Sequence, residues 1–316
     1  MTEARICSIR HALLFEGQLW LATYTSEVWA VDEVTGAKVG WQFVAPVRAM
    51  LRTTDGRLVA ATAPDTGGTV TLWQQSGRGW GQVRSWPRQD EYGPVALAEG
   101  DGRVLLAEAR RVHVVAPDGR SREVALTERI EGSRNTAAAF SGGRLYVAIS
   151  EGEFGGGLWR IDLATGMNSR VSRGPTTAVV AEARRPGCVL ASVGLDHMGS
   201  PVGAIERVCG RSREEVWQSP LRECDRTSPW RGPFCDTGSV AVWDVLPAPR
   251  GFWASTGEGI LRREAGRPDR WWTSVEVERR GGLVQSRTIP GLRLVWSDRE
   301  GAVSVGGGGA LLLPTE

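Results

Sequence analysis

Short apolar runs separated by glycine turns recur along the whole chain. The segment from Gly17 to Gly36, GQLWLATYTSEVWAVDEVTG, shows the pattern: a glycine, an apolar run, a short polar break, a second apolar run and a closing Thr-Gly. Apolar runs of this length, alternating or continuous, are typical of β-strands, and glycine supplies the positive φ that a tight turn demands. The segment therefore predicts a β-hairpin.

The same pattern recurs, which predicts a repeat architecture. A glycine precedes an apolar run at positions 17, 56, 102, 143, 187, 251 and 291, a period of about 40 residues, which is the length of one four-stranded propeller blade. Each unit contains an inner strand before the glycine, two apolar strands after it and a more polar outer strand, which protects the sheet edge. We predict an all-β fold: a single seven-bladed β-propeller of four-stranded antiparallel blades, with six or eight as the alternative number.

The predicted blades occupy the chain as one domain, residues 1–316. Two β-sandwich domains are the alternative, but they would not explain a single period that continues across the long irregular stretch after the fifth repeat. In the last repeat, SRTIPG is expected to end the inner strand and ALLLPTE to form the outer strand. The approximate blade ranges are 6–44, 47–88, 94–127, 135–173, 175–218, 239–277 and 283–316, with 219–238 as an inserted loop on the top face.

Three blade segments resemble known bacterial propeller repeats. VWAVDEVTG from Val28 and LWRIDLATG from Leu158 look like the third strand and turn of PQQ-like repeats, and GFWASTGEGILRRE from Gly251 resembles the blades of two-component-regulator propellers. The blades are also WD40-like in length, without the Gly-His and Trp-Asp pairing of typical WD40 blades. The resemblance implies a bacterial β-propeller and carries no catalytic residue with it.

Composition and charge narrow the range of partners. The chain has 41 glycines, 16 prolines and a hydrophobic fraction of 41%, which suits many short strands around a sizeable core. Its formal net charge of +2 gives no electrostatic case for binding nucleic acid or an anionic membrane. We therefore expect neither as a partner, and no motif indicates a cofactor.

The N-terminal residues and the cysteines predict a compartment. MTEARICSIRHALLFEG carries charges where a secretory signal needs an uninterrupted apolar core, so a cytoplasmic location is expected. Five cysteines, an odd number, fit reduced thiols there better than a disulfide framework.

The long loops are expected on the top face, which carries the loops after the second and fourth strands of each blade. The inserted loop combines aromatic residues with arginines, the usual composition of binding hot spots. Its aromatic residues could instead plug the channel. The predicted partner-binding residues of the top-face loops are Arg88, Tyr92, Arg129, Arg134, Phe154, Arg222, Arg226, Trp230, Arg231 and Phe234.

The cysteines give only a weak metal hypothesis. Cys188 and Cys209 are expected opposite each other near the bottom of one hairpin, whereas Cys224 and Cys235 lie in the top loop. With His197 nearby, the top-loop pair gives weak metal candidates, with free thiols or a disulfide as the other interpretations. No CxxC or HxxxH spacing supports a metal.

No motif assigns a catalytic residue. His11 and His113 lie inside strand patterns and are expected to be structural, and no GxSxG or Walker loop occurs. The predicted function is a non-catalytic scaffold that binds another protein, as a subunit or regulator of a bacterial assembly. One alternative is a hydrolase or lyase with acidic residues at the channel mouth. Another is carbohydrate binding by exposed tryptophans, although most of the 14 recur at strand positions that suit inter-blade core.

Overall fold

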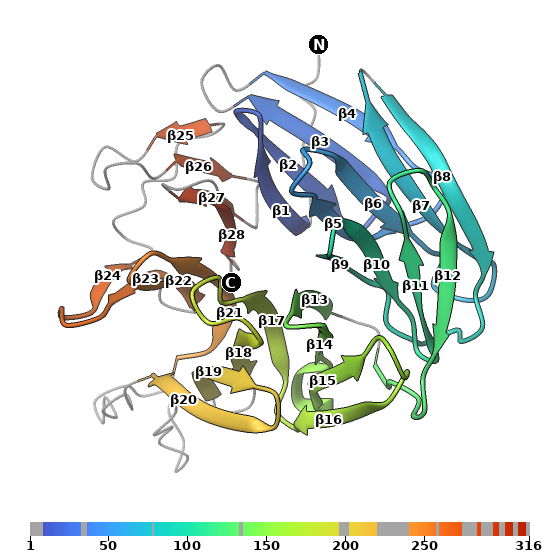
Figure 1. Ribbon diagram of the computed structural model, residues 1–316. Coiled ribbons are helices and arrows are strands. Elements are labelled where there is room, and N and C mark those ends of the chain that lie inside the picture. Colours follow the sequence, from blue (N-terminus) through green and yellow to red (C-terminus); the bar gives the residue numbers. More distant parts are fainter. Residues whose placement is uncertain are drawn as a thin grey trace, which may run out of the picture.

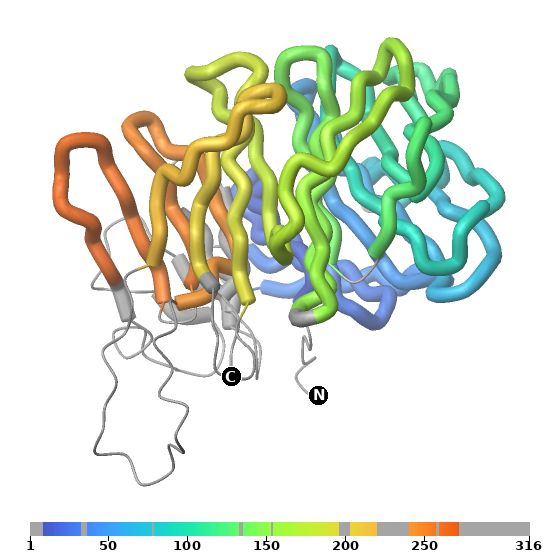
Figure 2. Tube along the Cα trace, turned by 90° about the horizontal axis from the view of Figure 1, so that it is seen from below, coloured from blue at the N-terminus to red at the C-terminus, as the bar shows by residue number. Residues whose placement is uncertain are grey.

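The computed structural model shows four-stranded antiparallel sheets arranged around a central axis (Figure 1). It describes residues 9–32, 37–77, 79–132, 135–195, 202–219, 240–256 and 259–273, together with the strands of 283–285, 293–296, 301–305 and 309–313. In Figure 2, the strands run between two faces of a ring. Among these residues, no helix has the length and hydrophobicity needed to cross a membrane.

Six blades follow the predicted strand order, with the first strand innermost (Figure 1). The first three are β1 (Ile9–Phe15), β2 (Gln18–Thr23), β3 (Glu27–Asp32) and β4 (Lys38–Gln42); β5 (Val47–Arg52), β6 (Leu58–Thr62), β7 (Thr69–Ser76) and β8 (Gly79–Pro87); and β9 (Ala96–Gly100), β10 (Arg103–Ala107), β11 (Arg111–Val115) and β12 (Ser121–Ala125). The next three are β13 (Asn135–Ser141), β14 (Arg144–Ser150), β15 (Gly156–Asp162) and β16 (Asn168–Ser172); β17 (Thr176–Ala181), β18 (Cys188–Leu195), β19 (Val202–Cys209) and β20 (Ser212–Gln218); and β21 (Val242–Ala248), β22 (Gly251–Thr256), β23 (Gly259–Glu264) and β24 (Arg270–Thr273), with the 3-10 helix η1 (Gly152–Phe154) after β14.

The C-terminal sheet has the reverse order. It contains β25 (Leu283–Gln285), β26 (Arg293–Trp296), β27 (Gly301–Val305) and β28 (Gly309–Leu313), and β28 lies at the centre against β1 and β21 (Figure 1). The prediction of a seven-bladed propeller is therefore wrong: the structure is a six-bladed β-propeller whose blades share one strand order, and the last sheet does not follow that order. The apolar segment GALLL takes the inner position that had been assigned to SRTIPG, because the centre of the ring is where inner strands pack on one another.

Glycine serves the turns for two different reasons. Gly17 and Gly187 have φ values of 72° and 84°, as the hairpin turns were expected to require. The φ angle of Gly251 is not positive. A Cβ there would instead meet the backbone carbonyl of Arg263, so glycine is needed for close approach of two strands.

The core lies between neighbouring blades, where the second strand of each of the six blades is buried along nearly its whole length. β6 is buried along its whole length, and Trp20 and Trp159 are also buried. Trp20 stacks on Trp41 with ring centroids 5.2 Å apart. Burial of these rings supports the interpretation of the recurring tryptophans as inter-blade core.

Candidate functional site

The predicted partner-binding residues divide into two groups. Arg88, Tyr92, Arg129 and Phe154 fall within the described part of the chain, all of them in connections on the top face. The other predicted site residues lie outside the described residues: Arg134, His197, Arg222, Cys224, Arg226, Trp230, Arg231, Phe234 and Cys235.

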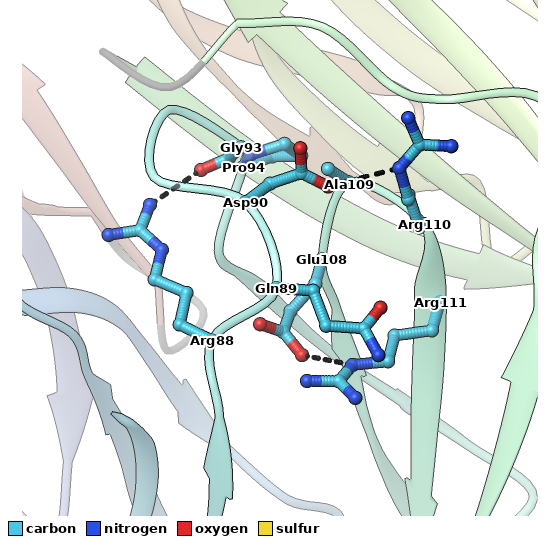
Figure 3. Close-up of a pocket in the computed structure, with 9 residues that line it drawn as sticks. All are labelled: Arg88, Gln89, Asp90, Gly93, Pro94, Glu108, Ala109, Arg110 and Arg111. Atoms are coloured by element: carbon cyan, nitrogen blue, oxygen red, sulfur yellow. Dashed lines mark hydrogen bonds and ion pairs between the residues drawn. The ribbon is translucent and has the colours of Figure 1, made fainter. Parts of the chain in front are cut away.

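Asp90 joins two of the top-face loops (Figure 3). Its carboxylate lies 3.4 Å from Nε of Arg110, in the β10–β11 loop, and accepts a hydrogen bond of 3.1 Å from Nε of Arg129, after β12. The Asp90 side chain is 17% exposed, whereas the Arg110 side chain is 58% exposed. Asp90 thus links the loop after the second blade to the third blade. The two arginines that it binds remain partly exposed on the surface.

Arg88 holds the same loop from the other side. Its guanidinium donates a hydrogen bond of 3.0 Å to the carbonyl of Gly93 and another to the carbonyl of Pro64. Burial, and then the charge of Arg48, lower the pKa of Arg88. The side chain is therefore used to position the loops, and the surface beside it is formed by Tyr92, which is 64% exposed.

Phe154 extends this surface onto the fourth blade. It lies in η1 and is 75% exposed. A Cβ at Gly132, three residues beyond Arg129, would lie 2.9 Å from Oε1 of Glu151, so the loop that carries Arg129 packs against the connection leading to η1. The top-face loops of the second, third and fourth blades form a contiguous set through these contacts.

Three arginines, Arg10, Arg48 and Arg88, lie close enough for their charges to interact, and only Arg88 was predicted as a site residue. Arg10 and Arg48 lie inside the strands β1 and β5, and only Arg88 is in a loop. Arg48 forms an ion pair with Asp65 and donates a hydrogen bond of 3.0 Å to the carbonyl of Ala63. A strand pattern cannot reveal such a cluster, because Arg10 belongs to the first blade and Arg48 and Arg88 to the second.

Burial and like charge shape the titration of this cluster. The pKa of Arg10 is lowered to about 10, first by burial and then by the charge of Arg48. The pKa of His11 is lowered to about 4 by burial and by Arg10, while its Nε2 lies 2.6 Å from the carbonyl oxygen of Arg48. The hydrogen bond and charge of Arg48 lower the pKa of Asp65. The cluster is therefore cationic near neutral pH, with His11 uncharged.

A buried ionic group supports the top-face loops from beneath. Glu108 accepts hydrogen bonds from Nε of Arg111 at 2.7 Å and from Nε2 of His113 at 2.8 Å, and all three residues are buried. Trp86 stacks on His113 with ring centroids 4.3 Å apart. His113 is therefore held inside the sheet, in agreement with its expected structural role.

The described residues contain no cluster of three or more His, Cys, Asp or Glu side chains that could hold a metal ion. Asp90, an acid of the top-face loops, is held by two arginines.

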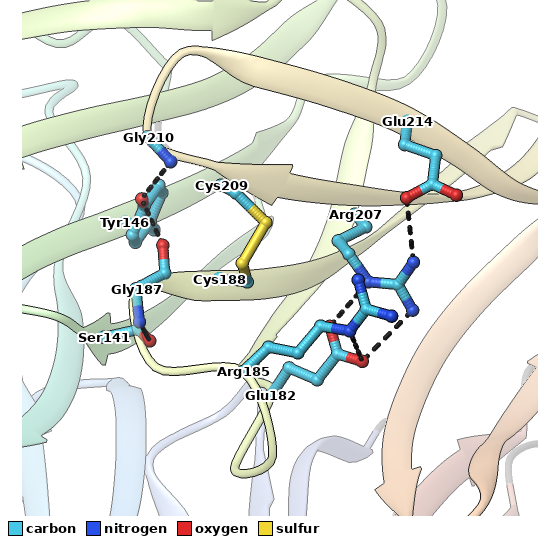
Figure 4. The surroundings of a disulfide bond; sticks show 10 residues. All are labelled: Ser141, Tyr146, Glu182, Arg185, Gly187, Cys188, Arg207, Cys209, Gly210 and Glu214. Atoms are coloured by element: carbon cyan, nitrogen blue, oxygen red, sulfur yellow. Dashed lines mark hydrogen bonds and ion pairs between the residues drawn. A yellow bond between two sulfur atoms is a disulfide. The ribbon is translucent and has the colours of Figure 1, made fainter.

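Cys188 and Cys209 form a disulfide, with Cα atoms 4.2 Å apart (Figure 4). They are directly opposed in the β18–β19 ladder, as the hairpin pattern predicted. The expectation of reduced thiols is wrong for this pair. Two cysteines that are distant in sequence become a disulfide only once the strand register places them side by side.

No protein-family model matches the chain, and no curated protein matches it either. Solved structures are similar in fold. The extracellular domain of a putative hybrid two component system from B. thetaiotaomicron has a TM-score of 0.56 and 11% identity over 98% of this chain. The extracellular domain of a putative one component system from the same organism has a TM-score of 0.53 and 10% identity over 98% of this chain.

This chain spans 38% of the length of both structures, and at such low identity the likeness shows the fold alone. The fold is that of a β-propeller with bacterial propeller neighbours.

Proposed function

We propose that this protein is a non-catalytic β-propeller scaffold that binds another protein through its top face. The observation that carries the proposal is the exposed pair Tyr92 and Phe154, which are 64% and 75% exposed on packed loops that also carry Arg110 and Arg129. Aromatic and arginine side chains dominate the binding energy of protein interfaces. Loops held in place by Asp90 and Arg88 lose little conformational freedom on binding.

The charge of the top face indicates the kind of partner surface that fits. Arg110 and Arg129 share the single carboxylate of Asp90, and Arg10, Arg48 and Arg88 lie near Asp65. Cations outnumber acids in both clusters. A partner surface with carboxylates around an apolar centre would complement them.

The alternative of a hydrolase or lyase is less well supported. It needs acidic side chains that are available to a substrate, but Asp90 and Asp65 are both paired with arginines. Carbohydrate binding by exposed tryptophans is also less well supported, because Trp20, Trp159 and Trp253 are buried.

The test is affinity purification of tagged full-length protein from its native cells at moderate salt. The variant is Tyr92→Ala/Phe154→Ala, and the matched control is Met167→Ala, because Met167 is 62% exposed in the turn between β15 and β16. We expect a stoichiometric partner with the wild type and the control, and its loss with the double variant.

Two results would overturn the proposal: no partner with the wild type, or the same partners with the double variant. A melting temperature measured on each purified protein separates a loss of binding from a loss of folding.

A further inference from the structure

A cleft lies between the fifth and sixth blades, on the face opposite the top-face loops. Its volume is about 740 Å³. The turn after β17 (182–185) and the ends of β19 and β20 form one side, and the turn between β21 and β22 (247–251) forms the other. Figure 4 shows residues of the first side beside the disulfide.

Two of the acids on one side of the cleft, Glu182 and Glu214, are already paired with an arginine. Arg207 donates hydrogen bonds of 2.7 and 3.1 Å to Glu182 and one of 2.9 Å to Glu214 (Figure 4). These hydrogen bonds, that of Glu182 foremost, raise the pKa of Arg207. The charge of Arg207 is therefore balanced by the protein's own carboxylates. Through these hydrogen bonds, Arg207 links β19 to β20 and to the 182–185 turn.

Two other arginines of the cleft, Arg184 and Arg250, have no such compensation among the described residues. Five arginines and three glutamates line it, so its formal charge is positive. Arg184 and Arg250 face the solvent on opposite sides, and within the described ranges neither has an ion pair. Arg185 lies 3.8 Å from Glu182, which Arg207 already holds. The rims of the cleft thus present guanidinium groups whose N–H donors are available to a ligand.

The walls between these rims are apolar. Val216, Pro247 and Ala248 are half-buried, and the buried side chains of Leu190 and Phe252 lie behind them. A second hollow of about 430 Å³ continues along β20 toward Trp217 and shares Glu215, Val216 and Arg263 with the cleft. The two hollows together form a groove rather than a round pocket.

We propose that this groove binds an extended acidic peptide segment of a partner protein, with an apolar side chain against Val216 and Pro247 and carboxylates on Arg184 and Arg250. Arginine binds carboxylates through paired hydrogen bonds. Proline and valine give an apolar surface whose side chains lose little conformational entropy on binding. A nucleic acid fits less well, because Glu214 and Glu215 would lie beside its phosphates and the apolar walls would meet no aliphatic side chain.

The disulfide keeps the arginine-bearing wall in place. The Cys188 amide donates a hydrogen bond of 2.9 Å to the carbonyl of Arg185, and the Glu182 amide donates one of 3.1 Å to the carbonyl of Cys188. Cys188 is in turn bonded to Cys209, at the end of the strand that carries Arg207. Such pre-organisation lowers the entropic cost of binding. The groove is independent of the proposed top-face site, because it lies on the other face.

The test is panning of a random peptide library against full-length protein, followed by fluorescence polarisation with the enriched synthetic peptides. The variant is Arg184→Ala/Arg250→Ala. The matched control is Arg103→Ala/Arg120→Ala, which removes the same charge from exposed residues beside turns of the third blade, on the same face. We expect peptides with Asp or Glu on both sides of an apolar residue, and a loss of affinity of about tenfold or more in the variant only.

Three results would overturn the proposal. The first is no enrichment, the second is enrichment of peptides without acidic residues, and the third is equal binding by the variant and the control. Binding of a labelled single-stranded oligonucleotide is measured in the same way. If the oligonucleotide binds more tightly than the peptides and loses binding in the variant, the ligand is a phosphate polymer and the peptide proposal is overturned. Circular dichroism of each variant verifies that the exposed substitutions leave the fold intact.

Discussion

The Tyr24 hydroxyl donates a hydrogen bond of 3.0 Å to Oδ1 of Asn135, although 111 positions separate the two residues in the chain. Tyr24 follows β2 in the first blade, and Asn135 begins β13 in the fourth, so the bond reaches across the ring (Figure 1). The guanidinium of Arg10 lies 5.3 Å from the centre of the Tyr24 ring. Blades distant in sequence are therefore in contact at the top of the molecule.

Tyr24→Phe removes only this hydroxyl. Because the bond is exposed, we expect the free energy of unfolding to fall by less than about 1 kcal/mol, measured by urea denaturation. Tyr92→Phe is the control: Tyr92 is more exposed, at 64%, and should leave stability unchanged. An equal effect of the two substitutions would show that the bond between the blades contributes nothing.

Glu108→Gln tests the buried ionic group. The substitution keeps the shape of the side chain but removes the charge that faces Arg111, which is 6% exposed, and His113. Leaving a buried guanidinium poorly compensated costs on the order of 3 kcal/mol. Thermal and urea unfolding measure the loss.

The control for that substitution is Glu123→Gln. Glu123 also contacts Arg111, at 3.2 Å, but its side chain is 47% exposed. We expect a loss below about 1 kcal/mol. A cost for Glu108→Gln as small as that of the control would contradict the assignment of Glu108 as the main counter-charge.

His11 predicts a pH dependence. Its pKa is about 4 in the folded protein against an ordinary value of 6.5, so the unfolded chain binds a proton between these values and the folded protein does not. Stability should therefore fall as pH drops from 6.5 to 4, by up to about 3 kcal/mol, and stay constant below that for this residue.

His11→Gln isolates this contribution, because glutamine does not titrate. Subtracting the stability profile of the variant from that of the wild type should leave a slope only in that interval. Asp65 contributes at lower pH, since its depressed pKa costs stability only below its ordinary value of 3.8. A difference profile that is flat between pH 6.5 and 4 would refute the role given to His11.

The Cys188–Cys209 disulfide closes a loop of 21 positions. Cys188→Ser/Cys209→Ser should lower the free energy of unfolding by on the order of 3 kcal/mol, because the unfolded chain gains conformational freedom. Wild-type protein in reducing buffer should match the variant. Two free thiols at these positions, titrated in protein purified from its native cells, would contradict the disulfide and restore the expectation of a reducing compartment.

Strand positions were predictable because they depend on local sequence. The run DGRLVAAT predicted a buried second strand, and β6 (Leu58–Thr62) is buried throughout. LWRID predicted a third strand, and β15 contains it. Alternation and glycine turns act over a few residues, so a single sequence carries this information.

The order of the C-terminal sheet depended on more than local pattern. Both SRTIPG and GALLL can form a strand, and the choice between them follows from what packs at the centre of the ring. β28 lies there against β1 and β21, strands that come much earlier in the chain. Local apolar content gave no information about those neighbours.

The sequence by itself determined the repeat and the strand order of the first six blades, and with them the connections that carry Arg88, Tyr92, Arg129 and Phe154. Only the tertiary structure decided that Arg10 and Arg48 lie near Arg88, that the opposed Cys188 and Cys209 are bonded to each other, and that Arg184 and Arg250 line opposite sides of one groove. The physical reason is that strands form from short-range patterns, whereas charges of separate repeats interact only when packing brings them together, and a disulfide needs the register of two paired strands.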